Sequence, residues 1–292
     1  IHGKNKGVAL TVDSSSPYCL VDPITGGKLV VCEAWRNLIS VGSKPIAITN
    51  CLNFGSPEKY EIMGQFVETI DGISQACKYL DFPVVSGNVS FYNETQSKAI
   101  PPTPTIGGVG LIKNLDYMMT INLKEIGSYI LVVGKTLGHL WQSEFFREVL
   151  EIKDGPPPEI NLFNEKNNGI LIQTLISKKL VNSVHDISSG GILVALSEMC
   201  ISGKIGAKIK IPRNNISPHE YLFGEDQSRY LIEINEKNKD EVSEILEKSN
   251  IYYEIIGKTQ KDCLYLNEEL NIKLTDLSKS NSFWFKNFFR ED

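Results

Sequence analysis

In the first 115 or so residues, short runs of β-branched residues alternate with stretches in which hydrophobic residues recur at three- to four-residue steps. This pattern predicts strands and helices in alternation. Val31, Ala34, Trp35 and Leu38 share one face of a predicted helix, which ends at Gly42. The predicted strands cover residues 7–13, 45–50, 83–89 and 106–112, and the predicted helices cover residues 26–40 and 57–80.

The second of these helices carries its own start signals. Ser56 offers an N-cap, Pro57 suits the first helical position, and Glu58 places an acid in the first turn. The polar segment 92–104, which precedes the last strand, contains three prolines and is long enough to suggest a functional loop.

The pattern changes after Lys113, which places a domain boundary near residues 114–126 and predicts domains at 1–118 and 119–292. Because residues 281–292 are rich in Trp and Phe, this tail is expected to be packed and not to extend freely into solvent. The second domain is expected to contain helices at 140–150, 170–178, 191–200 and 240–248, and strands at 129–133, 184–187, 207–211, 229–234, 252–256 and 263–266.

Composition narrows the class of protein. The 292 residues are 41% hydrophobic and 22% charged, which excludes a disordered chain and suffices for one large or two smaller domains. Thirty basic against 35 acidic residues give a net charge of −5, so neither a nucleic acid nor an anionic membrane is an expected partner. The longest apolar runs, such as 129–133, are too short to cross a bilayer.

Cysteine and histidine positions argue against a structural zinc site. The six cysteines form no C-x-x-C pair and the four histidines are dispersed. Free thiols of this kind fit a reducing compartment, so a cytoplasmic protein is expected. The chain opens with Ile1-His2-Gly3, which is neither an initiator Met nor a secretory leader, and we interpret it as a piece of a longer protein.

Two catalytic motifs are excluded and one binding motif stays open. A P-loop needs a glycine five residues before Gly134, where Tyr129 stands. His185 and Asp186 lie near two serines, but no G-x-S-x-G elbow accompanies them, which argues against a hydrolase triad. Segment 186–191, Asp-Ile-Ser-Ser-Gly-Gly, can bind an anion through its amides or form a capped tight turn, which is the commoner case.

Small and amide side chains gather at the ends of two predicted strands. Asn50 and Asn53 lie at the end of the first, and Gly87, Asn88 and Ser90 lie at the end of the second. Such oxygens suit a hard cation like Mg²⁺, which usually bridges to phosphate, so these strand ends fit a nucleotide and metal site. Asx-turn chemistry is the alternative explanation.

Six motifs, in order along essentially the whole chain, resemble the phosphoribosylformylglycinamidine synthase family of purine biosynthesis, and specifically the second of its two internally repeated halves. The motifs are DPITGGK at 22–28, KPIAITNCLNFGSPE at 44–58, SGNVSFYNET at 86–95, PTPTIG at 102–107, HDISSGG at 185–191 and LFGE at 222–225.

The resemblance implies an α/β fold of the α+β type, like that of aminoimidazole ribonucleotide synthetase. In this fold an N-terminal, sheet-forming nucleotide-binding domain precedes a second α/β domain. The family is an ATP-dependent carbon–nitrogen ligase that converts formylglycinamide ribonucleotide, ATP and glutamine-derived ammonia to formylglycinamidine ribonucleotide, ADP and phosphate. The implied cofactors are ATP and Mg²⁺. The implied partners are the N-terminal half of the synthase, a glutaminase subunit and a small accessory subunit.

The resemblance also assigns roles to single residues. Asn50 stands where the family typically has an ATP-contacting aspartate, Gly87 matches a glycine that contacts ATP, Asn88 matches a Mg²⁺ ligand, and Ser90 matches a residue that contacts the ribonucleotide. At Asn50 a negative charge is lost, although an amide oxygen can still coordinate. No catalytic residue is expected, because the family's catalytic histidines belong to the first half.

An isolated half is expected to be inactive and to form a homodimer through its first domain. One alternative is a self-sufficient relative, such as aminoimidazole ribonucleotide synthetase or a small-molecule kinase, but Asp13 is the only acid near the start where such enzymes carry an acidic metal motif. The other alternative is a non-catalytic half that holds a structural nucleotide, or none, and supports the active half. Nucleotide binding that requires Mg²⁺ and competes with substrate would argue against a structural nucleotide.

Overall fold

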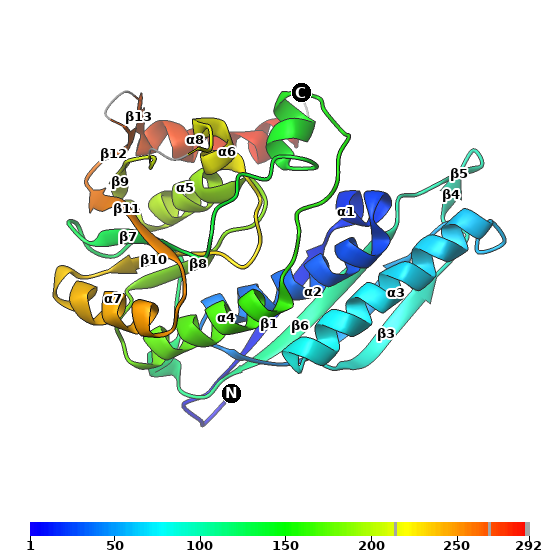
Figure 1. The fold of residues 1–292 in the computed structure, drawn as a ribbon, viewed down its shortest axis with the longest axis horizontal. Helices are drawn as coiled ribbons and strands as arrows, with labels where there is room; N and C mark the ends of the chain where they lie inside the picture. The colour runs from blue at the N-terminus through cyan, green and yellow to red at the C-terminus, as the bar shows by residue number, and fades with distance from the viewer. Residues whose placement is uncertain (213–214, 268–269, 290–292) are drawn as a thin grey trace.

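The computed structural model describes residues 1–212, 215–267 and 270–289. They form a four-stranded and a seven-stranded β-sheet packed together through helices, and a short two-stranded sheet (Figure 1). The elements of the first part are β1 (Gly7–Ser14), α1 (Ser16–Val21), α2 (Pro23–Ser40), β2 (Lys44–Asn53), α3 (Tyr60–Leu80), β3 (Val84–Ser90), β4 (Glu94–Thr95), β5 (Lys98–Ala99) and β6 (Thr103–Ile112). Those of the second part are β7 (Tyr129–Val133), α4 (Leu162–Ser177), β8 (Ser183–Asp186), α5 (Gly191–Gly203), β9 (Gly206–Ile209), α6 (Pro218–Phe223), β10 (Tyr230–Ile234), α7 (Lys239–Lys248), β11 (Tyr253–Gln260), β12 (Cys263–Leu266), β13 (Leu270–Lys273) and α8 (Leu274–Phe288).

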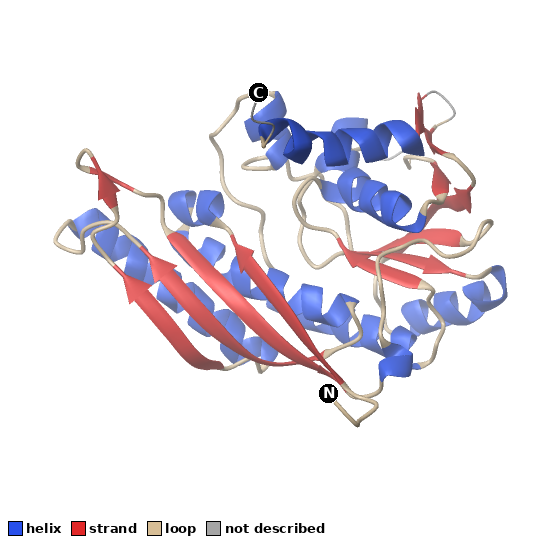
Figure 2. Ribbon diagram, turned by 180° about the vertical axis from the view of Figure 1, so that it is seen from behind, coloured by secondary structure: helices blue, strands red, loops and turns tan. Residues whose placement is uncertain are grey.

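The first sheet has the strand order β1-β6-β2-β3, with β3 at one edge and parallel to β2. Helices α2 and α3 cover one face of it, where Ile48 and Ile106 are buried. The other face carries no helix among the described residues (Figure 2). Along β1 the side chains of Val8, Leu10 and Val12 alternate with inward-facing neighbours and are 56%, 75% and 73% exposed. The uncovered face is therefore apolar at the β1 end.

The second sheet has the order β13-β12-β9-β11-β7-β10-β8 and is covered on both faces, by α4 and α7 on one side and by α5, α6 and α8 on the other (Figure 1). Strand β7 shows this directly. Leu131 and Val133 join a core that continues through α4 into α2 and α3, whereas Ile130 and Val132 join the core beneath α5. The first core therefore links the two sheets, and the predicted boundary between residues 118 and 119 remains a prediction.

In the first part of the chain, both predicted helices begin at other residues than predicted. Helix α2 begins at Pro23, three residues before the predicted start, because Asp22 caps it by accepting from the Thr25 amide at 3.0 Å. Helix α3 begins at Tyr60 and not at Pro57, so the prediction of Ser56 as the N-cap is wrong. The Ser56 amide donates to Glu94 Oε1 at 3.0 Å, and residues 56–59 form a separate turn.

The predicted helix at 140–150 is wrong, because only a π-helical turn at Phe145–Val149 forms there. Gln142 adopts a positive φ of 60°. The Ser143 hydroxyl donates to the Leu140 carbonyl at 2.6 Å and accepts from the Phe146 amide at 3.2 Å, so it replaces the helical bonds locally. Farther on, α4 begins at Leu162, eight residues before the predicted start. The strands predicted at 129–133 and 263–266 have the observed bounds, and the other predicted strands differ from the observed ones by up to four residues at their ends.

The aromatic tail folds as helix α8. Leu274 and Leu277 pack against the second core, but the aromatic side chains of the last turns are 58–70% exposed and contact mainly one another. These exposed side chains are Phe283, Trp284, Phe285, Phe288 and Phe289. The expected packing of the tail is therefore not met by the rest of the described chain, and residues 290–292 lie outside the described residues. No described helix is long and apolar enough to cross a membrane.

Candidate nucleotide and substrate site

The four residues singled out by the sequence lie on the neighbouring parallel strands β2 and β3. Asn50 pairs in register with Gly87, and Asn88 and Ser90 follow on the same strand. Because β3 is an edge strand, this group can also be reached along that edge of the sheet. The sequence predicted these residues at the ends of two strands, and they lie in the last four residues of β2 and β3, but the sequence does not show which face each residue occupies.

Asn50 and Gly87 lie on the helix-covered face. A Cβ atom added to Gly87 would lie 2.0 Å from Asn50 Oδ1, so the asparagine amide rests directly on the glycine. Asn50 also lines a pocket of about 420 Å³ between the sheet and α3, with mainly apolar walls that include Leu52, Ile70 and Val84. A pocket of this character can accept a flat apolar group beside a single amide.

Asn88 and Ser90 point to the opposite, uncovered face, because side chains alternate along a strand. Asn88 Nδ2 approaches Cys51 Sγ at 3.9 Å, and the Ser90 hydroxyl contacts Asn93 Oδ1 at 3.4 Å. Asn88 Oδ1 has no hydrogen-bond partner within residues 1–212, 215–267 and 270–289, so its lone pairs are available to a cation. The described residues include no group of three His, Cys, Asp or Glu side chains arranged around a metal position.

A second polar cluster, which sequence reasoning missed, lies at the seam between the two parts of the chain. Asn37 donates to Asp13 Oδ1 at 2.8 Å, and Glu33 stands one turn earlier on α2. From β8, Asp186 brings a buried Oδ2 atom that has no hydrogen-bond partner among the described residues. Burial raises the pKa of Glu33 to about 7 and also raises the pKa of Asp13. This cluster therefore favours protonation of Glu33 and Asp13.

His185 balances part of this negative charge. Its Nδ1 lies 3.2 Å from Asp186 Oδ1 and its Nε2 lies 2.9 Å from Glu198 Oε2. Burial alone would lower the pKa of His185, but the two carboxylates outweigh burial and raise it to about 9. Likewise, burial would raise the pKa of Asp186, but the hydrogen bond and charge of His185 hold it below its ordinary value. A protonated imidazole cannot act as the base of a triad, which agrees with the exclusion made from the sequence.

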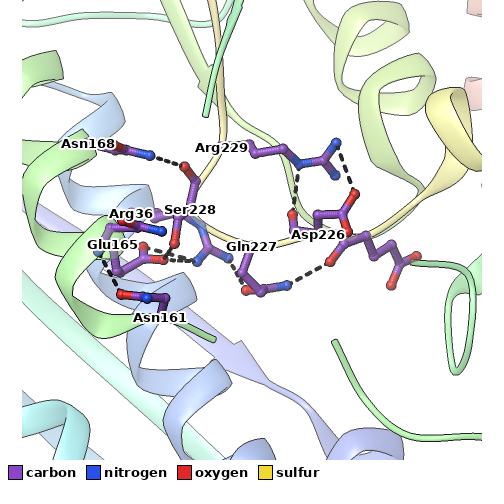
Figure 3. Close-up of polar contacts among 10 residues, drawn as sticks. Arg36, Asn161, Glu165, Asn168, Asp226, Gln227, Ser228 and Arg229 are labelled. Atoms are coloured by element: carbon purple, nitrogen blue, oxygen red, sulfur yellow. Dashed lines mark hydrogen bonds and ion pairs between the residues drawn. The ribbon is translucent and has the colours of Figure 1, made fainter. Parts of the chain in front are cut away.

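A buried ion pair fixes α2 against α4 beside this cluster (Figure 3). Arg36 Nη1 lies 3.0 and 3.1 Å from the two carboxylate oxygens of Glu165, and neither side chain is exposed. Arg36 Nη2 also donates to Gln227 Oε1 at 2.9 Å, and the Ser228 hydroxyl donates to Glu165 at 2.7 Å. The pair thus joins helices from the two parts of the chain to the segment that precedes β10.

Segment 186–191 forms the tight turn and not an open anion site. Gly190 has a φ of 79°, and the Gly191 amide donates to the Ser188 carbonyl at 3.1 Å. The Gly190 amide, which could have bound an external anion, donates instead to Glu225 Oε1 at 2.8 Å. A carboxylate of the chain itself therefore occupies the start of α5.

Comparison with known protein families defines the class to which this two-sheet chain belongs. The AIR synthase related protein family matches this chain with its N-terminal domain at residues 1–112 and with its C-terminal domain at residues 125–265. The chain belongs to this family and has its two-domain fold, as the resemblance predicted.

Within the family, the chain is homologous to part of the phosphoribosylformylglycinamidine synthase subunit PurL. The protein of that name from Pelagibacter ubique is 55% identical over 288 residues, which are 99% of this chain and 40% of the relative. The one from Rhodopseudomonas palustris is 45% identical over 283 residues, which are 97% of this chain and 38% of the relative. The chain thus spans about two fifths of the length of these relatives.

Solved structures show the same fold at lower identity. T. maritima PurL complexed with FGAR superposes with a TM-score of 0.78 at 20% identity, over 94% of this chain and 46% of that chain. T. maritima PurL complexed with ATP gives 0.74 at 20% identity, over 94% and 44%. Thiamine-monophosphate kinase from Stenotrophomonas maltophilia gives 0.66 at 14% identity, over 91% and 86%.

Proposed function

We propose that this chain is the second synthetase-like half of a phosphoribosylformylglycinamidine synthase and supplies one side of a composite active site. The synthase would convert formylglycinamide ribonucleotide, ATP and glutamine-derived ammonia to formylglycinamidine ribonucleotide, ADP and phosphate. The observation that best supports this proposal is the position of Asn88 and Ser90 on a sheet face that no described helix covers. A ligand held there would lie between this half and a second domain.

In the proposed reaction the γ-phosphoryl group of ATP is transferred to the amide oxygen of the substrate, ammonia attacks the imidate carbon, and phosphate leaves. Mg²⁺, when bound, supplies charge neutralisation at the phosphoryl oxygens. The available Oδ1 of Asn88 fits as one neutral ligand of that cation, and the carboxylate ligands would come from the other half. Ser90 would bind the ribonucleotide, and Gly87 would let the nucleotide approach the backbone of β3.

Asn50 would contact the nucleotide from the helix-covered face. Since Asn50 and Asn88 lie on opposite faces, one nucleotide can reach both only across the open edge of β3. The pocket of about 420 Å³ beside Asn50 is available to the part of the nucleotide on that face. An aspartate in place of Asn50 would add a negative charge. We therefore expect the contact of the Asn50 amide with the nucleotide to depend less on Mg²⁺ than the contact of an aspartate would.

The proposed partners are the N-terminal half of the same synthase, a glutaminase subunit and a small accessory subunit. The relatives are named as a subunit, which supports a synthase of several chains. We place the protein in the cytoplasm, because its six cysteines are all free and four of them are buried.

As an isolated piece, the chain is expected to form a homodimer through the uncovered face of the first sheet. Leu10 is 75% exposed at the apolar end of that face, and covering it removes apolar surface from water. Light scattering should show a dimer for the unaltered chain and a monomer for Leu10→Asp. Val149→Asp, at a 63% exposed site outside the sheet, should remain dimeric. A monomeric unaltered chain would contradict the prediction.

Isothermal titration of Mg-ATP tests the proposed site directly. We expect binding to the chain mixed with the first half, a drop of about tenfold or more in affinity for Asn88→Ala, and loss of binding without Mg²⁺. Asn271→Ala, at an exposed asparagine on the edge strand β13, is the matched control and should bind normally. Equal affinity of Asn88→Ala and Asn271→Ala would refute the assignment of Asn88. Binding that neither requires Mg²⁺ nor competes with the ribonucleotide would indicate a structural nucleotide instead.

A further inference from the structure

The loop that follows β7 forms a cradle for an anion. Gly134 and Gly138 adopt positive φ values of 98° and 82°, which turn the intervening backbone so that successive amides converge. The amides of Leu137, Gly138 and His139 donate to the Asp226 carboxylate at 2.9, 2.8 and 3.2 Å. Three consecutive N–H groups on one carboxylate are the arrangement that proteins use to bind phosphate and other oxyanions.

A buried cation stands behind this cradle. Arg229 is fully buried, and its Nη1 lies 3.7 Å from Asp226 Oδ2 (Figure 3). Its other donors bind the Asp226 carbonyl at 2.9 Å and the Gly224 carbonyl at 2.6 Å, which fixes the guanidinium in place. Amide dipoles and a buried positive charge together make this position favourable for an anion, whatever molecule supplies it.

The cradle can be reached from solvent. Leu137, Gly138, His139 and Asp226 all line one pocket of about 830 Å³. Lys135 lies at the same pocket and makes no hydrogen bond or ion pair with any described residue. A small anion could therefore enter, but the Asp226 carboxylate already fills the cradle.

We propose that loop 134–139 and Arg229 form a site for a small oxyanion of the carboxylate or phosphate class, which the chain fills with its own Asp226 side chain. As a tethered group, Asp226 has a high effective concentration and excludes external anions. The adjoining pocket is thereby closed to ligands that would place a phosphate or carboxylate on this loop. The proposal does not depend on the proposed function, whose residues lie on the first sheet.

Anion rescue of Asp226→Ala tests this site. The substitution removes the carboxylate and leaves three amides and Arg229 without their anion, so the melting temperature should fall by several degrees. Sodium formate at about 50 mM should restore about half of that loss or more, in a saturable manner, relative to sodium chloride at equal ionic strength. Inorganic phosphate should act similarly. The unaltered chain should respond equally to formate and chloride.

Asp226→Asn is the matched control, because its amide keeps the volume of the side chain and leaves no space for formate. It should respond to formate no more than the unaltered chain does. An equal formate response of Asp226→Ala and the unaltered chain would overturn the proposal and leave Asp226 as a structural contact only. If Asp226→Ala does not fold, its refolding from denaturant decides the matter. A yield increased by formate and not by chloride supports the site, and equal yields overturn it.

Discussion

Replacing Arg36 with methionine is expected to lower the free energy of unfolding by about 3–5 kcal/mol. Methionine fills much of the volume, but it leaves Glu165 as a fully buried carboxylate whose remaining side-chain partner is the Ser228 hydroxyl. Burial already raises the pKa of Glu165, which Arg36 partly offsets. Without the guanidinium that pKa rises further, so the loss of stability should be larger at about pH 8 than at about pH 5. Urea unfolding at both pH values measures it.

Two further variants separate the charge effect from a loss of packing. In the double variant Arg36→Met with Glu165→Leu no buried charge remains, so most of the lost stability should return. Lys59→Met breaks the Lys59–Glu94 ion pair at the protein surface, which has an N–O distance of 2.7 Å. It should cost much less stability than Arg36→Met, because water screens the two charges. If Arg36→Met costs no more than Lys59→Met, the buried pair does not hold α2 against α4.

Arg36 and Glu165 also show why the sequence predicted the elements better than the contacts between them. The apolar pattern of α2 identifies its core face, and Val31, Ala34, Trp35 and Leu38 are indeed buried. A charged residue in that helix is normally assigned to the surface, yet Arg36 is fully buried because its partner, 129 positions later, neutralises it. The first turns of α4, which carry Glu165, lie outside the predicted helix, because residues 164–169 are polar side chains and a glycine.

For the candidate site too, the sequence predicted the strands better than the contacts between them. Motifs placed Asn50, Gly87, Asn88 and Ser90 together because they lie on adjacent strands, and strand alternation alone separates Gly87 from Asn88 onto opposite faces. The second polar cluster, formed by Asp13, Glu33, Asn37 and Asp186, depends on the packing of α2 against β8. No local sequence pattern encodes that packing. The spacing of Glu33 and Asn37, one turn apart on the same helix face, was the one signal available in the sequence. Neither residue has an obvious partner until the fold brings Asp13 and Asp186 beside it.

His185 is expected to make the free energy of unfolding decline as the pH rises from about 6.5 to about 9. The folded protein holds the pKa of His185 at about 9, against an ordinary value of 6.5. Burial opposes the charged form, but Asp186 at 3.2 Å and Glu198 at 2.9 Å outweigh it. The stabilisation is fully present below the unfolded pKa, where histidine is charged in both states, and is lost as the pH passes the folded value. It amounts to about 3 kcal/mol.

Comparison with His185→Gln isolates this contribution, because glutamine keeps hydrogen-bonding capacity and does not titrate. Between about pH 6 and about pH 9.5 the stability of the unaltered chain should fall by about 3 kcal/mol more than that of the variant. Other titrating groups, including Glu33, affect both proteins and cancel in the difference.

Two control variants accompany this comparison. Glu198→Gln should show a smaller decline, since it removes only the half-exposed carboxylate. His2→Gln, at an exposed histidine, should behave as the unaltered chain. Parallel curves for the unaltered chain and His185→Gln would show that His185 is neutral between the two carboxylates. Asp186 and Glu198 would then bind a neutral His185 imidazole through hydrogen bonds alone. The cluster around Asp13, Glu33 and Asp186 would carry one more uncompensated negative charge.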